Sequence, residues 1–173
     1  MSISNIVIAD DGSTHAKEAL QIAVDLASKY EAKLTVVHVL THDSPPEELR
    51  HLVEVEHLAE VPHGQKQTSK TSSLLSRDLP VSEAIAEARV VAVLAEKILD
   101  NAINKATRSG IDNVSAVTKS GDYANCILDV AKENNADIII MGRRGLGNLK
   151  GLLFGSVSQK VSERADCSVL TVK

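Results

Sequence analysis

Short apolar runs alternate with amphipathic stretches along the chain. Residues 3–9 and 33–40 are apolar and rich in β-branched side chains, which is typical of buried strands. Between them, alanine and leucine recur at helical spacing from Ala16 to Ala27. The alternation continues with further strands predicted at 113–119, 137–141 and 168–172, and with further helices at 82–109, 122–135 and 156–164. Strands that alternate with helices in this way favour parallel pairing through right-handed crossovers.

The pattern predicts a doubly wound α/β fold, in which a single five-stranded parallel sheet is flanked by helices. We expect residues 1–173 to form one domain, because a chain of this length buries about 70% of the surface that it exposes when unfolded. The aromatic residues are Tyr30, Tyr123 and Phe154, so the core must be aliphatic.

Residues 41–80 interrupt the alternation. The segment is polar and rich in histidine, and 43–62 carry six acidic residues against one basic residue. We interpret it as a polar insertion with one short helix over 46–59. His51 and His57 lie six positions apart and do not share a helix face. An acidic flap over the site or against a partner is therefore favoured over a metal site formed with His42 and His63.

A glycine-rich loop, GRRGLGNLKGLLFGS, follows the fourth predicted strand at 142–156. Glycines let backbone N–H groups approach a ligand closely, and Ser156 stands where a helix begins, a position that favours anions. Residues 143–164 carry five basic residues and one acidic residue, whereas the whole chain has a net charge of −4. Ligands of open parallel sheets bind at the carboxyl ends of the strands. The loop therefore indicates a phosphate-binding site.

Stricter phosphate and catalytic motifs are absent. A Walker A motif needs a lysine that Gly155-Ser156 lacks, and a dinucleotide fingerprint starting at Gly145 would need glycine in place of Lys150. No G-x-S-x-G element supports a serine triad. A receiver-type signalling domain also has an acidic pair after its first strand. It would need an aspartate at the end of the third strand, where 118–120 read TKS, so this class is disfavoured.

The loop matches the G-x2-G-x9-G-[ST] signature of the nucleotide-binding universal stress proteins, with glycines at 142, 145 and 155 followed by Ser156. The flanks resemble that family as well: IVIADDGS at the first strand, VVHV at the second and ADIIIMGRRGLG at the fourth. The resemblance covers residues 3–40 and about 85–173, and the insertion falls where the family varies. It implies an adenine-nucleotide-binding, Rossmann-like sheet of five parallel strands, usually in a homodimer.

The resemblance also implies which residues hold the nucleotide. Residues 9–11 would line the adenine and ribose, Val39 would contact the base, and 141–142 would begin the phosphate loop. Gly145 and residues 155–157 would hold the ribose and phosphates. With Arg143 and Arg144, which we add because of the charge of the loop, the candidate site residues are Ala9, Asp10, Asp11, Val39, Met141, Gly142, Arg143, Arg144, Gly145, Gly155, Ser156 and Val157.

Some positions depart from the family pattern. Asp10 places a second carboxylate beside Asp11, where many members have an uncharged residue. Two carboxylates repel a triphosphate unless a cation such as Mg²⁺ intervenes, so we expect AMP or ADP to compete well with ATP. Tyr123 and Ser168 replace prolines that are frequent in the family, and neither is expected to touch the nucleotide.

No pattern indicates a positioned general base. We therefore expect a stress-response regulatory protein in which ATP, ADP or AMP acts as a conformational ligand, with at most slow ATP hydrolysis. A dimeric scaffold of the same fold that binds no nucleotide is the alternative, and the intact glycine signature argues against it.

Composition limits the other partners. The negative net charge and the scarcity of aromatic residues disfavour nucleic acids and anionic membranes. The first residues lack the pattern of a signal peptide and no apolar run suits a membrane span, so we expect a cytoplasmic location.

Cys126 and Cys167 have no metal-site spacing and are predicted to be buried thiols. The last strand, 168–172, is expected to pair across a two-fold axis in a homodimer.

Overall fold

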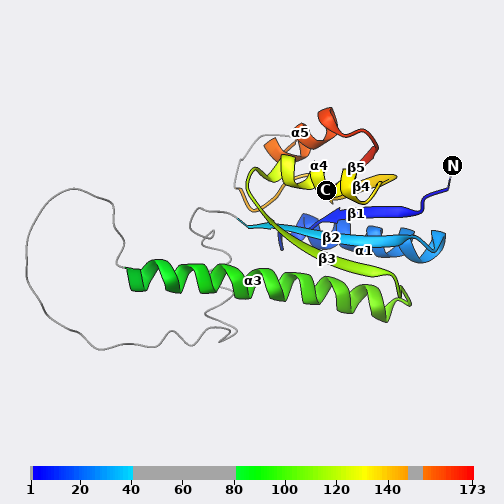
Figure 1. Cartoon of the computed structure of the whole chain (residues 1–173). Coiled ribbons are helices and arrows are strands. Elements are labelled where there is room, and N and C mark those ends of the chain that lie inside the picture. The colour runs from blue at the N-terminus through cyan, green and yellow to red at the C-terminus, as the bar shows by residue number, and fades with distance from the viewer. Residues whose placement is uncertain (1, 41–80, 148–153) are drawn as a thin grey trace, which may run out of the picture.

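A computed structural model describes residues 2–40, 81–147 and 154–173, with the side chains of 81–89 excepted. Its elements are, in chain order, β1 (Asn5–Ala9), α1 (Thr14–Tyr30), β2 (Lys33–Leu40), α3 (Val81–Arg108), β3 (Val114–Ser120), α4 (Tyr123–Glu133), β4 (Ile138–Gly142), α5 (Ser156–Arg164) and β5 (Ser168–Val172) (Figure 1). Every strand and helix predicted within these ranges is present. The predicted helix over 46–59 and the four histidines of the insertion lie outside the described residues.

The strands form one parallel sheet in the order β3-β2-β1-β4-β5. The chain winds from β1 outward to β3, then crosses to the other side of β1 and continues to β5. Helices α1 and α3 cover one face of the sheet, and α4 and α5 cover the other (Figure 1). The predicted doubly wound fold is thus confirmed. The order of the strands reverses between β1 and β4, which is where such sheets bind ligands.

The core is aliphatic on both faces of the sheet, as predicted. One cluster joins β1, β2 and Ile140 of β4 to the alanine-rich faces of α1 and α3. The other joins the opposite faces of the same strands to α4 and to Val161 of α5. Side chains of β1 and β4 are buried on both faces, which explains why these strands are continuous apolar runs in the sequence rather than alternating ones.

Local signals fix several element ends. The Ser13 hydroxyl accepts a hydrogen bond from the Ala16 N–H and caps α1, and the Asp122 carboxylate caps α4 in the same way. Gly110, with φ of 80°, follows α3, and the Ile111 N–H donates to the Ala106 carbonyl in a Schellman arrangement.

The amino end of β1 differs from the prediction. The first strand begins at Asn5 rather than at residue 3, because the Asp137 carboxylate accepts the N–H groups of Ser4 and Asn5 at 2.7 and 2.9 Å. This carboxylate immediately precedes β4, so it ties the starts of two neighbouring strands together.

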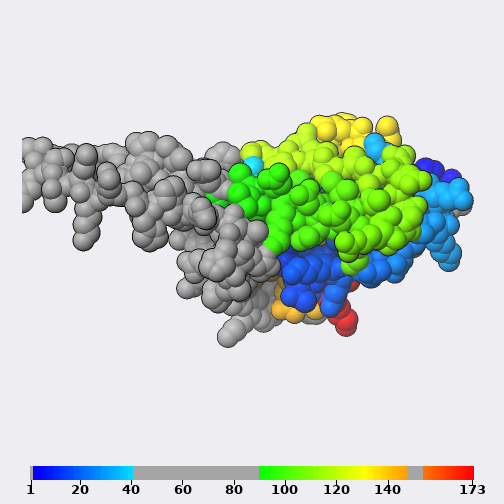
Figure 2. Space-filling view, turned by 90° about the horizontal axis from the view of Figure 1, so that it is seen from below, coloured from blue at the N-terminus to red at the C-terminus, as the bar shows by residue number. Residues whose placement is uncertain are grey.

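The surface adds two observations. Seen from the side of α3, the outer faces of α3 and α1 lie next to each other (Figure 2). Among the described helices, none combines the length and apolarity needed to cross a membrane.

Cys126 and Cys167 are half-buried, so the prediction of buried thiols is wrong. Desolvation still raises the pKa of the Cys167 thiol above its ordinary value.

Candidate functional site

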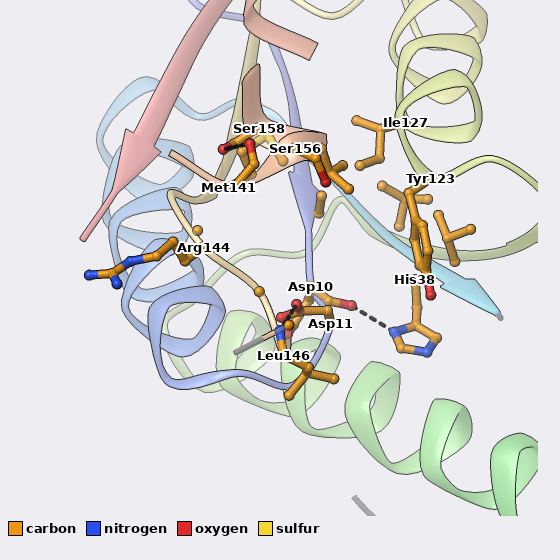
Figure 3. A pocket seen from close by; sticks show the side chains of 18 of the residues that line it. Asp10, Asp11, His38, Tyr123, Ile127, Met141, Arg144, Leu146, Ser156 and Ser158 are labelled. Atoms are coloured by element: carbon orange, nitrogen blue, oxygen red, sulfur yellow. Dashed lines mark hydrogen bonds between the residues drawn. The ribbon is translucent and has the colours of Figure 1, made fainter. Parts of the chain in front are cut away.

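A cavity of about 550 Å³ lies at the carboxyl ends of β1, β2 and β4 (Figure 3). Its volume falls within the range of small-molecule sites, about 300–1,000 Å³. All twelve candidate site residues line it, although they come from four separate segments of the chain. The structure thus brings them together at the switch point of the sheet. That they bind a nucleotide stays a prediction.

The turn between β1 and α1 presents two carboxylates to the cavity. Asp10 Oδ1 accepts the Gly12 N–H at 2.9 Å, and Asp11 Oδ1 accepts the Ser13 N–H at 3.0 Å. The Asp10 side chain is buried, and this desolvation raises the pKa of its carboxyl above the ordinary value. The neutral form of Asp10 is therefore favoured more in the folded chain than in the unfolded one.

The ring of His38, at the end of β2, holds the same turn from the other side. Its Nδ1 lies 2.7 Å from the backbone carbonyl oxygen of Asp10, and the side chain is buried. Since a carbonyl oxygen can only accept, Nδ1 carries a proton and donates it to this bond. His38 is thus a hydrogen-bonded core residue that also lines the cavity.

The two ends of the glycine-rich loop meet at the base of the cavity. The Gly155 N–H donates to the Arg143 carbonyl at 2.9 Å, and Ser158 Oγ lies 2.7 Å from the same carbonyl oxygen. Gly155 is the N-cap of α5 and brings no side chain, so the first N–H groups of this helix are left to water or a ligand. Ser158, buried and essential to this closure, was not singled out by the sequence.

Two glycines of the loop stand where no side chain fits. A Cβ atom on Gly142 would lie 2.9 Å from the His15 Cβ and 3.0 Å from the Arg144 carbonyl oxygen. A Cβ on Gly145 would run into Asp11 Oδ2, which accepts the Leu146 N–H at 3.2 Å. The Asp11 carboxylate therefore connects the β1–α1 turn to the loop, and this link needs glycine at 145.

The two arginines of the loop contribute differently from our expectation. Figure 3 shows the Arg144 side chain extending away from Asp10, His38 and Tyr123. The Nε atoms of Arg143 and Arg144 are buried without a hydrogen-bond partner within the described ranges. Arg144 therefore lines the cavity without turning its guanidinium toward these residues.

Several lining residues were missed by sequence reasoning. Tyr123, the first residue of α4, lies in the wall of the cavity, although we did not expect it to touch a nucleotide. Its neighbour on the same wall is Ile127. The α3 helix adds Val91, Leu94 and Ile98, which sequence reasoning had not singled out.

The side chains of the cavity supply only some of the oxygen ligands that a bound Mg²⁺ would need. Both oxygens of Asp11 and one oxygen of Asp10 already accept backbone N–H groups. Within 2–40, 81–147 and 154–173, no three histidine, cysteine, aspartate or glutamate side chains are grouped to hold a metal ion. Because Mg²⁺ prefers six oxygen ligands, a bound ion would need phosphate oxygens and water in addition to these carboxylates.

A parallel five-stranded sheet with a cavity at its switch point defines a Rossmann-like α/β protein. Residues 2–173 match the Universal stress protein family (Usp). The chain is 32% identical over 171 residues to the universal stress protein YxiE of Bacillus subtilis (strain 168), covering 98% of this chain and 99% of that one. It is 34% identical over 176 residues to the stress response protein NhaX of the same organism, covering 97% and 96%. The protein belongs to the universal stress protein family.

Solved structures share the fold. The hypothetical protein MJ0577 matches with a TM-score of 0.69 and 21% identity, covering 100% of this chain and 97% of that one. A universal stress protein in complex with cAMP matches with a TM-score of 0.63 and 21% identity, covering 100% and 99%. The universal stress protein from Archaeoglobus fulgidus in complex with dAMP matches with a TM-score of 0.57 and 22% identity, covering all of both chains.

Proposed function

We propose that this protein binds an adenine nucleotide in the cavity at the β1–β4 switch point and serves as a stress-response regulator. The observation that carries the proposal is the convergence of the glycine signature, the β1–α1 carboxylates and Val39 on one cavity. Family membership and the complexes of two solved relatives with cAMP and dAMP support it. The nucleotide acts as a conformational ligand, because it bridges a turn and a loop that are otherwise joined by Asp11.

The charges around the cavity favour a nucleotide with few phosphates. Asp10 and Asp11 both line it, whereas the guanidinium of Arg144 is directed away. AMP or ADP is therefore expected to compete well with ATP, and Mg²⁺ is expected to matter most for ATP, whose charge it offsets. Because the sequence has no motif that marks a positioned general base, we expect hydrolysis of ATP to be slow at most.

Thermal unfolding tests this proposal. In protein freed of co-purified nucleotide, AMP at about 100 times its Kd should stabilise the fold by about 2.7 kcal/mol and raise the Tm by roughly 5–11 °C. ADP and ATP, each with and without Mg²⁺, rank the ligands, and phosphate release measures hydrolysis. The absence of any shift would contradict the proposal and favour the dimeric scaffold, while rapid phosphate release would contradict the ligand role.

We also propose a homodimer that pairs through β5. This strand lies at the edge of the sheet, and its apolar residues Val169, Leu170 and Val172 are only partly buried. An apolar edge strand needs a partner or a cover. Light scattering at micromolar concentration is expected to give twice the mass of the 18.5 kDa chain. A monomer under these conditions would remove this proposal and leave the nucleotide site unaffected.

A further inference from the structure

The cavity has two chemically different halves. Asp10 and Asp11 bring carboxylates to one part of the lining, and the glycine-rich loop brings backbone together with Leu146 and Phe154. The opposite half is apolar apart from His38 and is lined by Val91, Leu94 and Ile98 of α3 together with Tyr123 and Ile127 of α4. A nucleotide is divided in the same way, into a flat base and a charged ribose phosphate. A base would therefore lie in the apolar half, between α3, α4 and the end of β2.

Tyr123 and Phe154 are the aromatic residues that line the cavity, and Tyr123 is the one that α4 carries beside Ile127. Figure 3 shows its ring beside Ile127 and next to His38, on the side of the cavity away from Met141 and Ser158. The side chain is 38% exposed although it lines the cavity, so part of the ring is not covered by protein. An aromatic ring in this situation offers a stacking surface for a flat heterocycle.

We propose that Tyr123 is a binding residue that stacks on the purine base of the bound nucleotide. This inference rests on the proposed function, since it assumes that an adenine nucleotide occupies the cavity. The position of Tyr123 on the first turn of α4 supports it, because the Asp122 cap fixes the backbone there through its bond to the Asn125 N–H at 3.0 Å. The ring is thus carried by a rigid helix start rather than by a loop.

The composition of the chain makes the contact directly observable. The protein contains no tryptophan, and its two tyrosines are Tyr30 and Tyr123. Tyr30 lies at the end of α1 with Lys29 over its ring and is not part of the cavity lining. In a Tyr30→Phe variant, tyrosine fluorescence reports on Tyr123 alone. Tyr123→Phe is the matched control, because the remaining emission then comes from Tyr30.

The test combines fluorescence with calorimetry, using AMP as the probe. AMP is expected to quench the emission of Tyr30→Phe and to leave that of Tyr123→Phe unchanged. By calorimetry, Tyr123→Leu should bind AMP about tenfold more weakly, whereas Tyr123→Phe, which keeps the ring, should bind within about twofold of the unmodified protein. Circular dichroism and the Tm without ligand establish that the variants are folded.

The outcomes separate this inference from the proposed function. If AMP binds by calorimetry, but Tyr123 emission is unchanged and Tyr123→Leu keeps its affinity, the stacking role is wrong and the nucleotide site stands. If the unmodified protein shows no heat of AMP binding, both are wrong. Quenching with weaker binding in Tyr123→Leu and rescue in Tyr123→Phe would establish the role.

Discussion

Ile140→Ala is expected to lower the free energy of unfolding by about 2–5 kcal/mol and the Tm by about 4–20 °C. Ile140 lies in β4, between β1 and β5, and its side chain is fully buried in the cluster beneath α1 and α3. Removing three carbon atoms there loses their transfer free energy and leaves a cavity that the surrounding strands cannot close. Chemical denaturation and a thermal scan measure both quantities.

Ile138→Ala is the matched control for this substitution. Ile138 lies in the same strand two residues earlier, so it points to the same face, but it is only partly buried against the same cluster. The same atoms are removed from a less buried site, and the loss should be clearly smaller. Equal losses at the two positions would show that burial in this cluster does not govern the stability of β4.

The sequence predicted the sheet and its helices because their signals are local. Apolar runs of β1 and β4, alanine spacing in α1 and the cap residues Ser13 and Asp122 each act within a few neighbouring residues. The candidate site residues were also accessible, since a strand end followed by glycines or carboxylates is a short-range pattern. The resemblance to the universal stress proteins then indicated an adenine nucleotide as the expected ligand of these patterns.

What the sequence missed depends on how distant elements are oriented. Tyr123 seemed remote from the site because its own neighbours give no sign that the first turn of α4 borders β2 and α3. Ser158 looked like an ordinary helix residue, although its hydroxyl closes the loop through the Arg143 carbonyl. Arg144 was chosen by charge, and charge does not determine the direction of a side chain. Each of these features depends on how segments that are distant in the sequence are placed in space, and the periodicity of the sequence does not determine this.

Gly145→Ala is expected to weaken AMP binding by roughly 10- to 150-fold. The new Cβ would displace the Asp11 carboxylate, which lines the proposed site and accepts the Leu146 N–H. In the proposed complex this displacement would remove the hydrogen bond of Asp11 to the nucleotide; a hydrogen bond to a charged group contributes about 1.5–3 kcal/mol, and each 1.4 kcal/mol corresponds to about a tenfold change in affinity. Because the obstructing atom is the end of a flexible side chain, Asp11 can turn aside without unfolding the protein. Calorimetry with AMP measures the effect.

Gly147→Ala separates this effect from a general change in the loop. Gly147 lies two residues further along the same loop, and a Cβ there would meet nothing within 4 Å. Although Gly147 also lines the cavity, its substitution leaves the Asp11 link intact, so it should change AMP affinity much less than Gly145→Ala does. A second readout needs no ligand: amide exchange of Leu146 should accelerate in Gly145→Ala and not in Gly147→Ala, because only the former removes the Asp11 acceptor. If both variants keep the exchange rate and the affinity of the unmodified protein, the link from Asp11 to the loop does not shape the site.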